Sequence, residues 1–159
     1  HTVSDRNNDG SDSPKIWNDL MTNNTVQTNP FGLTVELTNI SQTTTNVLVD
    51  PTNTILNGSQ GAVSKLIFHN GATIKLTPTA NATAKGLIWQ TGVAKTSKTK
   101  VMCASSTFFN GRVVLLTDSS PADDGTGNPS DTLYFGWTDA AGNHTRLHLN
   151  ASYWLAKLQ

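Results

Sequence analysis

The stretch Leu33-Thr34-Val35-Glu36-Leu37-Thr38 alternates apolar and polar residues one by one. Successive side chains of a β-strand point to opposite faces, so this alternation predicts a strand with one apolar and one polar face. Asn-Gly pairs, which favour tight turns between antiparallel strands, follow at Asn70-Gly71 and Asn110-Gly111. The pattern predicts an antiparallel sheet with one face exposed to water.

Strand-like segments and turn residues recur along the rest of the chain. Nine or ten strands with local connections favour an all-β, antiparallel β-sandwich of the jelly-roll or immunoglobulin-like type. A two-residue loop at Asn70-Gly71 would place His69 opposite Ala72 and Ile67 opposite Ile74. We expect strands at 32–39, 45–50, 86–91 and 153–155, and hairpins that join 62–69 to 72–78, 106–109 to 112–117, and 132–138 to 144–149.

Two parts of the chain are expected: a polar N-terminal arm at 1–30 and the β-sandwich domain at 31–159. Within the arm, Ser13 can cap a short helix, and Pro14 suits the first helical position. The helical period then puts four apolar side chains on one face, namely Ile16, Trp17, Leu20 and Met21.

The composition of the 159 residues narrows the class of protein. Only 14% of the residues are charged and the formal net charge is zero, so bulk charge directs the chain neither to nucleic acid nor to an anionic membrane. No run of 18 apolar residues predicts a transmembrane segment. The single cysteine, Cys103, lies in an apolar run and is expected to be buried and inert. A disulfide-free domain rich in Thr and Asn suits a secreted protein or one on a cell or virion surface.

The N-terminal arm carries a candidate calcium site. Its oxygen-bearing side chains alternate around Gly10, in a pattern that resembles the start of an EF-hand-type or thrombospondin-repeat-type calcium loop. The resemblance implies Ca²⁺ as a cofactor, but the twelfth loop position is Ile16 instead of an acidic residue. An exposed acidic arm is the alternative. The candidate ligands are Asp5, Asn7, Asp9 and Asp12.

A second candidate site lies in the polar loop at 118–131, because long loops of this kind often carry function. Its carboxylates could bind Ca²⁺ or accept hydrogen bonds from sugar hydroxyls, and a surface loop without a ligand is the alternative. Tyr134 and Trp154 could supply flat faces on which sugars stack. The segment 135–139 and its Gly142-Asn143 turn resemble small β-sandwich lectins and lipid-binding aegerolysins in the spacing of their residues. The candidate ligand-binding residues of the loop are Asp118, Asp123, Asp124, Asn128 and Asp131.

Histidines suggest two further metal sites. On the predicted strand 144–149, His144, Arg146 and His148 would share one face, where the two histidines could bind a transition metal or sense pH. A plain polar face is the alternative. An N-terminal His1 could chelate copper, as in copper polysaccharide monooxygenases, although those enzymes usually contain disulfides.

Known catalytic motifs are missing from the sequence, including the Gly-x-Ser-x-Gly elbow, the phosphate loop and Cys-x-x-Cys. We therefore expect no enzymatic activity. One hypothesis is a lectin-like or adhesin-like binding module that recognises glycans or a host surface through loops at one end of a sandwich. Another is a structural subunit of a filament, coat or capsid, in which copies of the chain assemble through the arm. The third is a membrane-active toxin or lipid binder.

Overall fold

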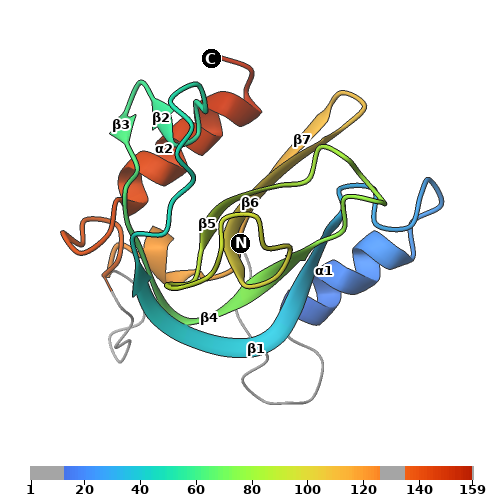
Figure 1. Cartoon of the computed structure of the whole chain (residues 1–159), viewed down its shortest axis with the longest axis horizontal. Helices are drawn as coiled ribbons and strands as arrows, with labels where there is room; N and C mark the ends of the chain where they lie inside the picture. Colours follow the sequence, from blue (N-terminus) through green and yellow to red (C-terminus); the bar gives the residue numbers. More distant parts are fainter. Residues whose placement is uncertain (1–12, 126–134, 159) are drawn as a thin grey trace.

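A computed structural model describes residues 13–125 and 135–158 (Figure 1). The described residues form antiparallel strands with two α-helices, which confirms a β-rich fold. They contain seven strands, so the predicted sandwich of nine or ten strands is not confirmed. The elements are α1 (Ser13–Thr22), β1 (Leu33–Thr44), β2 (Asn57–Gly58), β3 (Gly61–Ala62), β4 (Leu66–Leu76), β5 (Lys85–Trp89), β6 (Val101–Phe108), β7 (Gly111–Leu116), the short 3₁₀ helix η1 (Ser120–Ala122) and α2 (His144–Leu155).

Five strands make one curved sheet and two make a small hairpin. The sheet has the order β1-β4-β6-β5, with β7 on β6, while β2 pairs with β3. Register shifts bend β1 between Glu36 and Gln42, and β1 sweeps in a broad curve beneath the other strands in Figure 1. Because the chain after β1 also hydrogen-bonds to β5 (Leu48 N to Leu87 O, 2.8 Å), the sheet curls toward closure.

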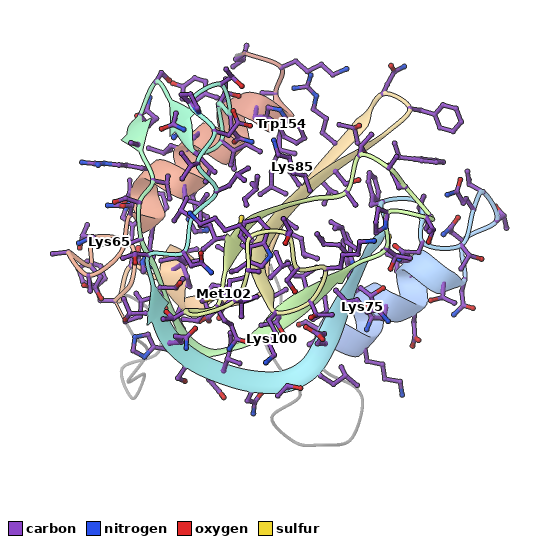
Figure 2. All side chains as sticks on the ribbon, viewed as in Figure 1. Lys65, Lys75, Lys85, Lys100, Met102 and Trp154 are labelled. Carbon is purple, nitrogen blue, oxygen red and sulfur yellow. The ribbon has the colours of Figure 1, made fainter. Side chains whose placement is uncertain are left out.

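The core consists of two apolar clusters, and each is covered by one of the helices. In the first cluster, Phe68 and Met102 pack against Leu147 of α2, and Figure 2 shows Met102 in the middle of the molecule. In the second, Trp17 of α1 packs against the buried side chains of Leu33 and Ile74 and their neighbours. Figure 1 shows the two helices well apart, with α1 beside β1 and α2 on the opposite side of the molecule.

The predicted short helix is confirmed as α1, but its buried face differs from the prediction. Trp17 is half-buried and Met21 is buried, as expected from the helical period. Ile16 and Leu20 are instead 62% and 60% exposed. The helix lies along the edge of β1, where the Trp17 indole donates to the carbonyl of Leu33, so only part of the apolar surface faces the sheet.

The predicted hairpin at Asn70-Gly71 is wrong, because β4 runs through these residues without turning. Gly71 pairs with Ile40 of β1, and the predicted pairs of His69 with Ala72 and of Ile67 with Ile74 do not form. A Cβ atom on Gly71 would lie 2.7 Å from the Phe68 ring and 2.9 Å from the carbonyl oxygen of Thr117. The glycine thus permits close packing of the chain after β7, and no turn is needed here.

The hairpin predicted around Asn110-Gly111 is confirmed, with its turn one residue earlier than expected. Phe108 pairs with Gly111, so Phe109 and Asn110 form the two-residue loop between β6 and β7. Phe109 is 89% exposed and adopts a positive φ of 49°. The predicted strand at 86–91 is also confirmed, as β5, while 45–50 contributes only a bridge between Val47 and Ile88.

The strands predicted at 144–149 and 153–155 are wrong, because both segments belong to α2. The buried residues of α2 are His144, Leu147, Asn150 and Ala151, whose spacing of three to four residues is helical. Residues 135–138, the described part of the strand predicted at 132–138, form turns and irregular chain. The third predicted hairpin is therefore absent from the described residues that would form it.

Candidate functional site

Several predicted site residues lie outside the described residues, and their roles stay predictions. Among them are the candidate calcium ligands Asp5, Asn7, Asp9 and Asp12, the candidate sugar ligands Asn128, Asp131 and Tyr134, and the terminal His1. Within the described ranges, no group of three His, Cys, Asp or Glu side chains is placed to hold a metal ion.

Asp118 lies inside the fold directly after β7 and is fully buried. Its carboxylate accepts hydrogen bonds from the backbone N–H groups of His69 (2.5 Å) and Ser120 (2.9 Å), which tie β4 to η1. Burial raises the pKa of this carboxyl group, and the two backbone donors oppose that shift. The observed contacts of Asp118 thus join two elements of the protein.

The described part of the acidic loop also carries Asp123 and Asp124. The Asp123 side chain accepts a hydrogen bond from Gly125 N (2.8 Å). The backbone carbonyl oxygen of Asp123 accepts one from Trp137 N (2.8 Å). Asp124 is exposed. The structure brings neither aspartate together with Trp154 in a common cavity.

Trp137 lines a cleft of about 310 Å³ at the start of α2. The polar side chains there are used within the protein: Lys65 donates to the carbonyl of Ala140, and Arg146 donates to that of Ala62. Asn143 accepts hydrogen bonds from the backbone of residues 64 and 65. These polar side chains of the cleft thus also join chain segments of the protein.

His144 and His148 occupy successive turns of α2, so the predicted shared strand face does not exist. The His144 ring is buried and accepts a hydrogen bond at Nε2 from Ile67 N (3.2 Å), which leaves Nδ1 to donate to the carbonyl of Gly136 (2.7 Å). Burial lowers the pKa of both histidines. Both ring nitrogens of His144 thus serve to hold chain segments together, in the neutral form of the ring.

Trp154 lines a second cavity, of about 270 Å³, and comes from the last turn of α2. The guanidinium of Arg112 lies over its indole, 4.9 Å from the ring centre, and is not part of the cavity wall. Lys85 of β5 lines the same cavity, and both residues lie in the upper part of the molecule in Figure 2. The cavity is otherwise lined by Asp50, Thr52, Asn53, Thr54, Ile55 and Ser105.

The polar rim of this Trp154 cavity is held in place by an ion pair and a turn. Lys85 Nζ lies 2.8 Å from Asp50 Oδ2, and Thr52 donates from its hydroxyl to Asp50 Oδ1 at 2.7 Å. These hydrogen bonds, the one from Lys85 foremost, lower the pKa of Asp50 to about 2. The carbonyl of Asp50 accepts from Asn53 N (3.1 Å) and from the Asn57 side chain (2.9 Å), which fixes the turn.

Among the residues that line this cavity, the sequence analysis had proposed only Trp154 as a candidate, and it had not selected Asp50 or Lys85. The sequence Asp50-Pro51 indicated a turn after the segment 45–50, which places Asp50 in a loop. The ion pair joins Asp50 to Lys85, which are 35 positions apart in the sequence, so no local sequence pattern predicts it.

No helix among the described residues has the length and apolar character needed to cross a membrane. In comparisons with protein-family models, with curated proteins and with solved structures, no match to this chain was found.

Proposed function

We propose that the protein is a non-enzymatic binding module, secreted or displayed on a cell or virion surface, which recognises carbohydrate through the Trp154 cavity. The observation that carries the proposal is one cavity in which a flat indole lies beside the Asp50–Lys85 ion pair. The two charged side chains are 26% and 48% exposed, so a ligand can reach them.

The chemistry of these groups matches that of a sugar. A pyranose ring has an apolar C–H face, which packs on an aromatic plate, and hydroxyl groups that both donate and accept hydrogen bonds. Asp50 supplies an acceptor and Lys85 supplies a donor, so one sugar hydroxyl could bridge the pair. A cavity of about 270 Å³ is small and suits one or two sugar rings.

Pre-organisation also supports this proposal. Arg112 donates to the carbonyl of Trp154 and packs on its indole, while Thr52 and Asn53 fix the turn that holds Asp50. Side chains that are already ordered lose little conformational freedom when a ligand binds, and this raises affinity.

A glycan array followed by calorimetry on the bound glycans tests the proposal. We expect Trp154→Ala to weaken binding by at least about tenfold, and Trp154→Phe to weaken it less because a smaller plate remains. Lys85→Gln should also weaken binding. Lys75→Gln is the matched control, because Lys75 is exposed on β4 and lies away from Trp154 in Figure 2.

Two results would contradict the proposal. One is a wild-type protein that binds no glycan on the array, and the other is a Trp154→Ala variant that is folded and binds as tightly as the wild type. Adding a chelator in the same calorimetry experiment separates a calcium-dependent site from one that uses protein groups alone.

A further inference from the structure

One face of α1 is exposed and combines apolar and charged side chains in two neighbouring rows. Ile16 and Leu20 form an apolar row, with exposures of 62% and 60%. Lys15 and Asp19, both exposed, form the row beside it. Residues four apart lie above one another on a helix, so the two rows run along the helix axis.

We propose that this face of α1, defined by Lys15, Ile16, Asp19 and Leu20, binds the same face of a second copy of the chain. In an antiparallel pair of these helices around a two-fold axis, Ile16 of one copy meets Leu20 of the other. The same symmetry brings Lys15 of each copy to Asp19 of the other. The face is thus complementary to itself in charge, and its apolar row meets the same row of the second copy.

The helix that carries this face is held firmly on the sheet. The side-chain amide of Asn18 hydrogen-bonds to both the N–H (2.8 Å) and the carbonyl (2.9 Å) of Val35, and Trp17 donates to the carbonyl of Leu33. Helix α1 therefore does not need to rearrange before it pairs, which lowers the entropic cost of association.

Charge favours a second copy over a lipid surface as the partner. Interfacial helices that bind membranes carry an excess of Lys and Arg on the polar face. The exposed face of α1 has one basic and one acidic residue, and its net charge is zero. Such a face gains nothing from an anionic bilayer, whereas an antiparallel copy supplies the opposite charge at each position.

The size of the helix sets the expected strength of the contact. Helix α1 has ten residues, which corresponds to a length of about 15 Å. A contact centred on two short helices falls below the area of stable dimers, so we expect a dissociation constant in the range of about 10 to 500 µM.

Sedimentation equilibrium over this concentration range, with a charge exchange, tests the proposal. Lys15→Asp and Asp19→Lys each create like charges across the two-fold axis, and each should weaken association by about tenfold. The double variant K15D/D19K exchanges the pair and should recover association to within about threefold of the wild type. Leu20→Asn should also weaken association, because it removes apolar contact.

A matched control is Val49→Asn, which alters an apolar side chain that is 83% exposed. Val49 lies in the segment between β1 and β2 and is not part of α1. This variant should associate like the wild type. A wild-type protein that remains monomeric over the whole range overturns the proposal. The proposal is also overturned if the double variant associates as poorly as the single variants. Circular dichroism must show an unchanged fold in all variants for this comparison.

Discussion

At the scale of single residues, Asn18 closes part of an open strand edge. An edge strand exposes unpaired N–H and carbonyl groups to solvent and to other chains. The Asn18 side chain has an amino group that donates to the carbonyl of Val35 and a carbonyl oxygen that accepts from its N–H, as a neighbouring strand would. One amide thereby attaches α1 to β1.

Replacing Asn18 by Ala should destabilise the protein by about 1 to 3 kcal/mol, because two partly buried backbone groups lose their partner. Urea denaturation measures this change in the free energy of unfolding. Asn39→Ala, at an exposed position of the same strand, is the control and should change stability by less than about 0.5 kcal/mol. Equal effects of the two substitutions would contradict the role assigned to Asn18.

At the scale of elements, the β2–β3 hairpin is attached to α2 by one buried side chain. Asn150 accepts a hydrogen bond from Gln60 N (3.0 Å) and donates one to the carbonyl of Gly61 (3.0 Å). The close approach depends on Gly58, where a Cβ atom would lie 2.3 Å from the carbonyl oxygen of Thr54 and 2.5 Å from the Asn150 oxygen.

We expect Gly58→Ala to destabilise the protein by at least about 2 kcal/mol, since one of the clashing atoms belongs to the backbone and the other to a buried side chain. Thermal and urea unfolding would both report the loss. Ser59→Ala changes the exposed neighbour in the same turn and should be nearly neutral. A stable Gly58→Ala variant would mean that the hairpin is free to move away from α2.

Elements with strong local signals could be predicted from the sequence. Ser13 and Pro14 marked the start of α1, and the alternation after Gly32 predicted β1. The Asn110-Gly111 pair indicated the hairpin between β6 and β7 within one residue. In each case, the residues that decide the structure lie within a few positions of one another.

The remaining elements depend on contacts between distant residues. Asn70-Gly71 has the same local signal as Asn110-Gly111, but Gly71 is surrounded by Phe68, Thr117 and Asp118 and continues a strand. Leu147 and Leu149 fit an alternating pattern, while Leu147 and Ala151 fit a helical one, and burial selects the helix.

The residues of the Trp154 cavity also include one that the sequence could suggest and others that depend on distant contacts. Its aromatic residue could be selected by residue type, because an indole is a common platform for sugars. The ion pair of Asp50 with Lys85 and the contribution of Ser105 come from three separate parts of the chain, which only the fold brings together.

At the scale of the whole molecule, His144 joins three parts of the chain. Its ring connects α2 to β4 through Ile67 N, and to the segment before the helix through the carbonyl of Gly136. His148, one turn later, directs its Nδ1 to the carbonyl of His144 at 2.8 Å. The contact with Ile67 N requires a neutral imidazole, because a protonated ring has no acceptor for that N–H, whereas the Nδ1–H group can donate to Gly136 in either form.

This arrangement predicts that the protein loses stability on acidification. Burial lowers the pKa of His144 and His148 in the folded protein below the ordinary value of 6.5, while the unfolded chain keeps that value. Below about pH 6.5 the unfolded state then binds more protons than the folded state, so the free energy of unfolding falls as the pH falls toward about 5. The stabilisation by neutral histidine is fully present above this range.

Urea denaturation at several pH values between about 7.5 and 5, on the wild type and on His144→Gln, measures this dependence. The variant should be less stable at neutral pH, because glutamine does not reproduce both ring contacts, and its stability should fall less steeply with acid. Asp118 contributes the opposite sign, since a raised pKa gives stability that is lost as the pH rises through the folded value, so the comparison of variants isolates the histidine. An equally steep fall in His144→Gln would show that His144 does not cause the pH dependence, and a substitution of His148 would then be the next comparison.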